Sequence, residues 1–263
     1  MSTIDHTLSK GAVSPAVTLP RNTSIGSRML YSRLIGALFL AGFVVYGVGF
    51  GLVTSVVGTP DFLLTIAAHQ TTLVLGAFLM LLNTAVDVGK GVLFFPILEN
   101  HGKRSALAYL AALIVQVLLL DIGVLCLLMI VPLGQYASDG GGTSVAWATA
   151  LGSLLNHANT MAYQIGQATL AVGGIFLCAL LFRTRLIPRW LALWGVIGYG
   201  IHVAGAIAEI FGIPISLMLL IPGMFFELML PGWLLIKGFQ AEAYGSRAEI
   251  AITPTAGPAE ATR

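Results

Sequence analysis

The stretch LVLGAFLMLLNTAVDVGKGVLFFPI, residues Leu73–Ile97, is apolar along almost its whole length. It is longer than the ~20 residues that an α-helix needs to cross the hydrocarbon core of a bilayer. Yet it contains Asn83, Asp87 and Lys90, and a charged group in hydrocarbon costs on the order of 3 kcal/mol or more. The stretch therefore predicts a membrane-spanning helix whose polar residues need a structural or functional reason.

The composition of the whole chain extends this interpretation. Of its 263 residues, 57% are hydrophobic and 9% are charged, whereas a soluble domain carries about 25% charged residues. Long apolar runs recur, and we predict an all-α polytopic membrane protein, a six-transmembrane-helix bundle. The predicted spans lie at about Leu34–Val57, Leu73–Ile97, Ser105–Val131, Met161–Phe182, Arg189–Phe211 and Ile215–Lys237.

The segments outside the spans are predicted as follows. Residues 1–33 and 239–263 are expected to be disordered tails around a transmembrane domain at 34–238, because neither can bury enough apolar surface to fold. Two of the loops, Thr59–Thr72 and Ser144–Thr160, predict short helices at the outer interface. The second of these could continue into the fourth span.

The basic residues predict the orientation of the bundle. Twelve of the thirteen Lys and Arg residues fall in the tails and in two of the predicted turns. The three opposite loops, residues 58–72, 132–160 and 212–214, contain none. The positive-inside rule then places both termini in the cytoplasm, and we expect a multi-pass protein of the plasma membrane. Lys90 is the one basic residue on neither side.

Small residues predict where helices approach each other closely. Gly47 and Gly51 have the GxxxG spacing, and Gly200 and Ala204 form a weaker version of it. Such spacing favours tight helix packing inside a bilayer.

Polar residues at membrane depth occur on several of the predicted spans. Asn83, Asp87 and Lys90 are spaced i, i+4 and i+7, so they share one helix face. Charged groups inside spans face the interior or a water-filled cavity. We therefore hypothesise one shared polar chamber in the outer half of the membrane. Its candidate ligand-binding residues are Asn83, Asp87, Lys90, Asp121, Gln164, Gln167, His202, Glu209 and Glu227.

Three hypotheses for the function stay open. In the first, the protein is not an enzyme, and the chamber binds a small molecule, an ion or a lipid headgroup and could move it. In the second, it is an intramembrane enzyme that uses Asp87, Asp121 or Glu227 in acid–base chemistry on a lipid-like substrate. This second hypothesis includes a variant with a His–Asp metal site, built on His69, His157 and His202. In the third, it is a structural or accessory subunit whose polar groups pair with each other.

Several other classes of site have no motif in the sequence. HxxxH, HExxH and CxxC are absent, so we predict no metal site. There is no Walker motif, GxSxG or dinucleotide fingerprint, and the basic residues are typical of orientation signals and not of a nucleic-acid surface. The expected partner is the lipid bilayer. The sequence assigns no catalytic residue, cofactor or oligomeric state.

Three segments carry a likeness to a known family. They read VDVGKGVLFFPILENHGKRSALAYLAALIVQ at Val86–Gln116, RTRLIPRWLALWGVIGYGIHVAG at Arg183–Gly205, and FELMLPGWLLIKGF at Phe226–Phe239. With these segments the chain resembles, over roughly Arg33–Phe239, the bacterial membrane family catalogued as domain-of-unknown-function family 4386. In that family too, a span with a central aspartate leads to a short basic turn, and the last span ends in Trp-Leu-x-x-Lys-Gly. The resemblance implies a six-helix integral membrane protein without an assigned activity, and it implies no catalytic residues.

Overall fold

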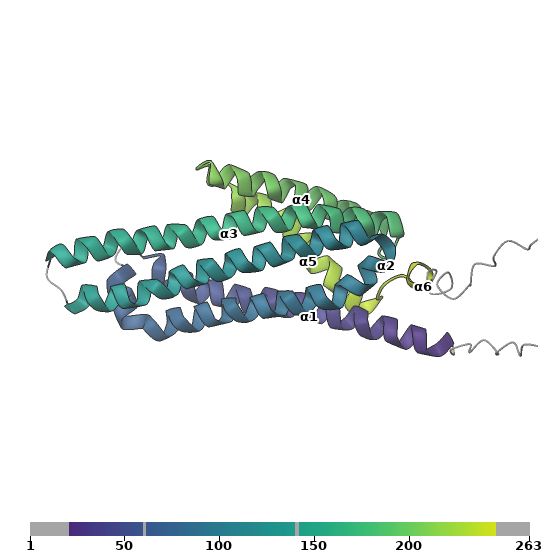
Figure 1. The fold of residues 1–263 in the computed structure, drawn as a ribbon, viewed down its shortest axis with the longest axis horizontal. Coiled ribbons are helices and arrows are strands. Elements are labelled where there is room, and N and C mark those ends of the chain that lie inside the picture. The colour runs from purple at the N-terminus through teal and green to yellow at the C-terminus, as the bar shows by residue number, and fades with distance from the viewer. Residues whose placement is uncertain (1–20, 60–61, 140–141, 246–263) are drawn as a thin grey trace, which may run out of the picture.

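The computed structural model describes residues 21–59, 62–139 and 142–245, and these residues form helices without any strand. Five of the helices are long and apolar enough to cross a membrane, which confirms the predicted all-α membrane protein. The elements are α1 (Arg21–Val57), α2 (Phe62–Asp139), α3 (Gly142–Thr184), α4 (Arg189–Ile210), α5 (Ser216–Ile236) and α6 (Ala241–Gly245), shown in Figure 1.

Helix α2 doubles back on itself at Gly102 (Figure 1). Its backbone leaves the helical conformation there (φ 179°, ψ 86°) and also at His69 (φ −123°, ψ 30°). A Cβ on Gly102 would lie 2.6 Å from Leu180 Cδ1, so the Leu180 side chain of α3 packs directly against this turn. The turn separates two antiparallel legs, residues 70–101 and 103–139. The predicted count of six spans requires each leg to cross the membrane, and that count stays a prediction.

The long helices form a closed ring. Consecutive helices contact each other from α1 to α5, and α5 returns to contact α1. Glycines make several of these approaches close. A Cβ on Gly49 would lie 2.8 Å from Gly76 O of α2, one on Gly198 2.9 Å from Pro222 O of α5, and one on Gly36 3.0 Å from Pro231 O. Side chains that point inward from every helix therefore meet in one interior.

The glycines predicted to mediate packing are not the ones that do so. Added Cβ atoms on Gly47, Gly51 and Gly200 would meet nothing within 4 Å. The close approach of α1 to α2 uses Gly49, which lies between the first two. Residues two apart in a helix point in nearly opposite directions, ~200° apart. The GxxxG prediction therefore selected the wrong face of α1.

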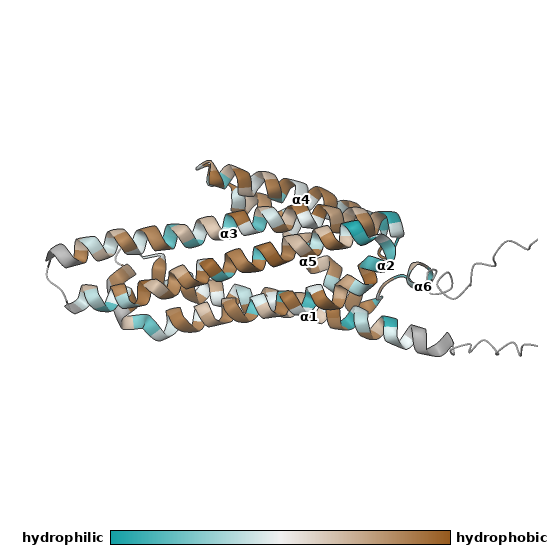
Figure 2. Cartoon of the chain, viewed as in Figure 1, coloured by the Kyte–Doolittle hydropathy of each residue, from teal (hydrophilic) through white to brown (hydrophobic). Residues whose placement is uncertain are grey.

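Basic side chains gather at one end of the bundle, which we call the basic end. The described Lys and Arg side chains near the helix ends all lie there, namely Arg28, Arg33, Lys103, Arg104, Arg183, Arg185, Arg189 and Lys237. Figure 2 shows strongly hydrophilic residues at this end, where the start of α1 and α6 also lie, and some hydrophilic residues at the opposite end. The opposite end, where α2 begins and α3 begins, is called the far end. Which end faces the cytoplasm stays a prediction.

The structure differs from the predicted tails at both boundaries. Helix α1 begins at Arg21, and α6 forms at residues 241–245. The apolar side chain of Phe239 is fully buried, which gives this part of the chain the apolar contact that a disordered tail lacks. The remaining predicted tail residues, 1–20 and 246–263, lie outside the described residues. Residues 62–68 and 145–160 are helical, as predicted for the two loops, and the second segment is continuous with α3.

The bundle has two apolar cores of different construction. The core nearer the basic end takes residues from all five long helices, including Ile35, Phe94, Leu181, Leu191 and Phe226. The core nearer the far end takes residues from α1, α2 and α3 alone, including Val53, Ile66, Leu127, Ile130 and Ala148. The reason is length: α3 has 43 residues, whereas α4 has 22 and α5 has 21. Helices α4 and α5 therefore do not extend as far toward the far end as α3 does.

Candidate functional site

The charged residues that opened the sequence analysis form a hydrogen-bonded row on α2. Lys90 Nζ donates to Asp87 Oδ1 at 2.7 Å, and Asn83 Nδ2 donates to Asp87 Oδ2 at 3.2 Å. The ammonium group also lies over the ring of Phe39 in α1, 4.3 Å from its centroid. Asn83, Asp87 and Lys90 are 6%, 6% and 8% exposed. The common face predicted from their spacing is therefore turned into the bundle and away from lipid.

A second carboxyl group faces this row from α5. Tyr199 of α4 donates its hydroxyl proton to Glu227 Oε1 at 2.8 Å. Lys90 interacts electrostatically with Glu227 as well as with Asp87. We call Asn83, Asp87, Lys90, Tyr199 and Glu227 the polar cluster. It combines residues from α2, α4 and α5. Helix α2 is not next to α4 or α5 in the ring, so these residues come together across the interior of the bundle.

The charges of the polar cluster do not balance when every group is ionised. Asp87 and Glu227 carry two negative charges, and Lys90 carries one positive charge. An uncompensated charge in a protein interior costs several kcal/mol. A proton or a small cation on one carboxyl group would remove the excess charge, so the cluster has the chemistry to bind either one.

The two carboxyl groups differ in their surroundings. Asp87 is buried, whereas Glu227 is only half-buried. On the far-end side of the cluster, the rings of Tyr46 and Tyr163 stack with their centroids 6.1 Å apart and their planes at 17°. These tyrosines come from α1 and α3, which are not neighbours in the ring. The stacked pair therefore spans the interior next to the cluster.

Other predicted site residues form a separate group near the far ends of α4 and α5. Gln164 Nε2 donates to Ser216 Oγ at 3.0 Å, and Ser216 N donates to Glu209 Oε2 at 3.3 Å. These contacts join α3 to the turn between α4 and α5. His202 is buried on α4, where a Cβ on Gly223 would lie 3.6 Å from its Nδ1. Gln167 is half-buried on α3.

The second leg of α2 carries two buried side-chain oxygen atoms that accept no hydrogen bond from the described residues. Asp121 Oδ1 and Gln116 Oε1 are buried and have no hydrogen-bond partner among the described residues. The candidate residues thus fall into three places: the polar cluster, the Gln164–Ser216–Glu209 group, and the second leg of α2. Among the described residues no hydrogen bond or ion pair joins these places, and their assignment as one binding site stays a prediction.

The three histidines of the alternative metal site lie in different environments. His69 and His157 are exposed, and His202 is buried. His69 Nδ1 lies 3.1 Å from the backbone oxygen of Thr65 on its own helix. Across residues 21–59, 62–139 and 142–245, no group of three or more His, Cys, Asp or Glu side chains is placed to hold a metal ion.

The aromatic neighbours of the polar cluster were not predicted from the sequence. Phe39 lies under the Lys90 ammonium group, and Tyr46, Tyr109 and Tyr163 interact electrostatically with charged residues of the cluster. A signal existed for one of them, because Tyr109 and Gln116 are seven residues apart and therefore share a helix face. Phe39 and Tyr46 sit in an apolar span and carry no such mark.

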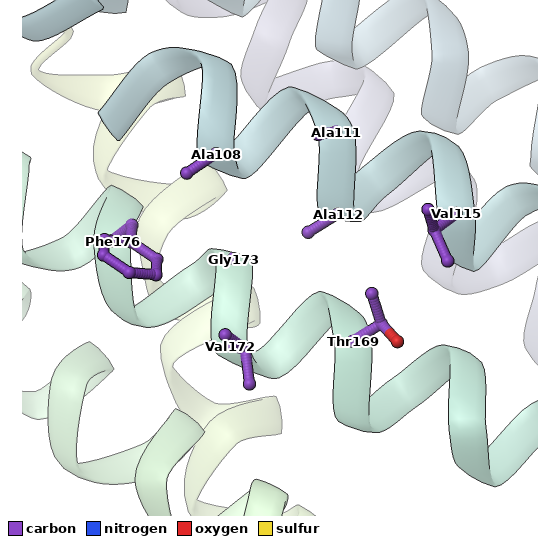
Figure 3. A pocket seen from close by; sticks show the side chains of 8 residues that line it. All are labelled: Ala108, Ala111, Ala112, Val115, Thr169, Val172, Gly173 and Phe176. Carbon is purple, nitrogen blue, oxygen red and sulfur yellow. The ribbon is translucent and has the colours of Figure 1, made fainter. Parts of the chain in front are cut away.

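An apolar groove lies between the second leg of α2 and α3, and none of its lining residues belongs to the polar cluster (Figure 3). Its volume is about 380 Å³, and its lining consists of Ala108, Ala111, Ala112, Val115, Thr169, Val172, Gly173 and Phe176. The one hydroxyl in this lining, on Thr169, donates to Ile165 O. The groove thus offers a ligand apolar contact only, and in a membrane lipid chains can fill it.

Comparison with known proteins identifies the family and nothing finer. No curated protein matches the chain, and no solved structure matches it. The family described as "Domain of unknown function (DUF4386)" matches residues 34–238, which include every residue of the polar cluster. The chain therefore belongs to the DUF4386 family.

Proposed function

We propose that this membrane protein binds a proton or a small cation at the polar cluster, and that it acts by taking up and releasing this ion. The observation that carries the proposal is the presence of two carboxyl groups and one lysine in the same interior: Lys90 forms an ion pair with Asp87 at 2.7 Å, and the charge of Glu227 acts on Lys90 from across the ring. A buried site with one negative charge in excess favours a positive ligand.

Packing around the cluster supports a small ligand over a bulky one. A Cβ on Gly42 would lie 2.9 Å from Asn83 Oδ1, and a Cβ on Gly174 would lie 2.5 Å from the Tyr199 ring. The backbones of α1 and α3 therefore press directly against the cluster. Of the ligands considered for the predicted chamber, an ion fits this space better than a small organic molecule or a lipid headgroup.

Glu227 is the group that we assign to ion exchange. Asp87 is held by Lys90 and by Asn83, which satisfies both of its oxygens. Glu227 has a single hydrogen bond, from Tyr199, and it is less buried than Asp87. Adding or removing a positive charge on Glu227 therefore disturbs fewer contacts. The Tyr199 hydroxyl, which donates to Glu227, can adjust its hydrogen bond when the charge of that carboxyl group changes.

The orientation belongs to the same proposal. We place the basic end in the cytoplasm because Lys and Arg are retained on that side of a membrane. With six crossings, both termini are cytoplasmic and the far end points out of the cell. The polar cluster then lies between the two surfaces of the plasma membrane, and its ion must come from one of them.

Infrared difference spectroscopy on purified protein in lipid nanodiscs tests the proposal. A protonated carboxyl group has its own carbonyl band, and we expect one such band to titrate in the wild type and to vanish in Glu227→Gln. Tyr199→Phe should keep the band but shift its frequency, because it removes one hydrogen bond to the same carboxyl group. Glu99→Gln, at an ion pair near the basic end, is the matched control and should leave the band assigned to Glu227 unchanged.

A cation is distinguished from a proton by repeating the titration with Na⁺, K⁺ or choline as the only added cation. A band that disappears with Na⁺ or K⁺ at constant pH indicates that the metal ion replaces the proton. If the Glu227→Gln spectrum equals that of the wild type under every condition, Glu227 exchanges no ion and the proposal is wrong.

A further inference from the structure

The chain folds back over the basic end after α5. Gly238 has a positive φ of 69°, and a Cβ there would lie 2.7 Å from Met29 Sδ. Glycine suits this position for both reasons, since other residues avoid positive φ. The segment that follows, residues 239–245, contains α6 and is called the strap. It lies within the stretch that the sequence predicted to be a disordered tail.

Three backbone contacts hold the strap on the bundle. Arg28 Nη1 of α1 donates to Phe239 O at 2.8 Å, and Phe239 N donates to Ser32 Oγ at 3.1 Å. Gln240 N donates to Leu186 O, in the turn between α3 and α4, at 2.9 Å. The strap is thereby fixed to opposite sides of the ring.

Aromatic rings connect the strap to the polar cluster. Phe239 is fully buried, and its ring centroid lies 5.7 Å from that of Phe94. The Phe94 centroid in turn lies 6.3 Å from that of Tyr109, which interacts electrostatically with Lys90. The strap and these rings are therefore the layer between the polar cluster and the basic end.

His101 contacts the strap in a way that depends on its protonation. Its Nδ1 lies 2.8 Å from Ile97 O, and its Nε2 lies 2.9 Å from Ala243 O. A carbonyl oxygen only accepts hydrogen bonds, and a neutral imidazole has one N–H donor. Both contacts are hydrogen bonds only when the ring carries two protons and a positive charge. In the neutral ring, one contact becomes an approach of two lone pairs.

We propose that the strap is a gate between the basic end and the polar cluster, and that doubly protonated His101 is its latch. Loss of a proton from His101 weakens the latch, and the strap then leaves the ring more often. This inference rests on the proposed function in one respect only: the proposed function identifies the ion that passes the gate, a proton or a small cation.

The elements around His101 carry other titratable groups. These are Glu99, Lys103 and Arg104 of α2, Arg28 and Tyr31 of α1, Arg183 of α3, Arg185 of the α3–α4 turn, and Glu242 and Tyr244 of α6. Burial raises the pKa of the Tyr244 phenol, so it keeps its proton at neutral pH. Histidine is the side chain that changes charge between pH 5 and 8, which makes His101 the group to test.

Hydrogen exchange of the strap amides measures the latch. In full-length protein in nanodiscs, we expect the strap of the wild type to exchange about fivefold faster at pH 8 than at pH 6 after correction for intrinsic rates, as for the loss of one hydrogen bond. His101→Phe, which removes both donors, should exchange fast at both pH values. His101→Gln, which does not titrate, should show no difference between them. His157→Phe, at an exposed histidine of α3, should behave as the wild type.

Equal protection at both pH values in the wild type would overturn the latch, and so would a pH response that persists in His101→Gln. Glu227→Gln should leave the response of the strap unchanged. The latch is thus tested separately from ion binding, and either idea can fail while the other stands.

Thiol labelling measures the gate. Cys178 is fully buried in the core nearer the basic end, and Cys126 is half-buried on α2. Gly238→Ala disfavours the docked strap without altering His101 or the cluster. We expect it to raise the rate at which a small water-soluble thiol reagent modifies Cys178 severalfold and to leave Cys126 unchanged. If the strap exchanges faster in Gly238→Ala but Cys178 reacts no faster, the strap is not a gate.

Discussion

The half of the bundle near the basic end and the half near the far end are made from the same helices but solve different problems. Near the basic end, all five long helices, with both legs of α2, close a ring around the buried charges of Asp87 and Lys90. Near the far end, α1, α2 and α3 continue without α4 and α5, and the buried side chains that pack together there, such as Ile66 and Leu127, are apolar. The polar cluster lies where the ring is complete.

This difference indicates what the short helices α4 and α5 contribute. They provide Tyr199 and Glu227, and they also close the side of the ring that α1, α2 and α3 leave open. A lysine in contact with lipid would have to reach for the interface. Inside a closed ring, Lys90 instead finds a carboxylate and an aromatic face. Two helices of membrane length thus convert an apolar three-helix assembly into one that holds charge.

Removing Lys90 should have the largest effect on the free energy of unfolding. Lys90→Ala leaves the Asp87 carboxylate buried without its partner, and breaking a buried ion pair in this way costs about 3–5 kcal/mol. We expect a loss of this size in the free energy of unfolding, measured in mixed detergent micelles. Lys90→Met combined with Asp87→Asn removes both charges and should recover most of the loss. A loss below ~1 kcal/mol in Lys90→Ala would mean that the pair is not buried as described.

A cavity in the far half should affect stability without affecting the cluster. Ile66 is fully buried, and truncating such a side chain to alanine costs about 2–5 kcal/mol. Ile66→Ala should therefore lower the free energy of unfolding but leave the carboxyl band of Glu227 unchanged. Ile122→Ala, at a residue that is 53% exposed, is the control and should cost less than ~0.5 kcal/mol. A changed carboxyl band in Ile66→Ala would show that the two halves are coupled.

The sequence predicted what depends on one helix at a time. Apolar length identified the helices, and the i, i+4, i+7 spacing placed Asn83, Asp87 and Lys90 on one buried face. Both properties follow from the geometry of a single α-helix. Basic residues likewise marked the helix ends, and the structure gathers these ends on one side of the bundle.

What depends on two helices could not be predicted in the same way. The electrostatic influence of Glu227 on Lys90 from across the ring depends on which helices are neighbours, and close approaches of glycines decide this. The chain has 31 glycines, so many pairings satisfy a small-residue pattern, and Gly49 was missed beside the GxxxG pair. The strap was missed because its binding comes from Phe239 and from backbone contacts. Composition alone shows neither.

The smallest predicted effect concerns the second ion pair of α2, which has the same chemistry in the opposite environment. Lys103 Nζ lies 3.3 Å from Glu99 Oε1, with side chains that are 69% and 37% exposed. Water and salt screen such a pair, and its net contribution is about 0.3–0.5 kcal/mol. Lys103→Ala should therefore change the free energy of unfolding by no more than this, and raising the salt concentration should remove the difference. Lys90→Ala should keep its effect at high salt, because buried pairs are screened much less. If both variants respond to salt alike, then water reaches Lys90, and the interior of the ring is more open to water than the structure shows.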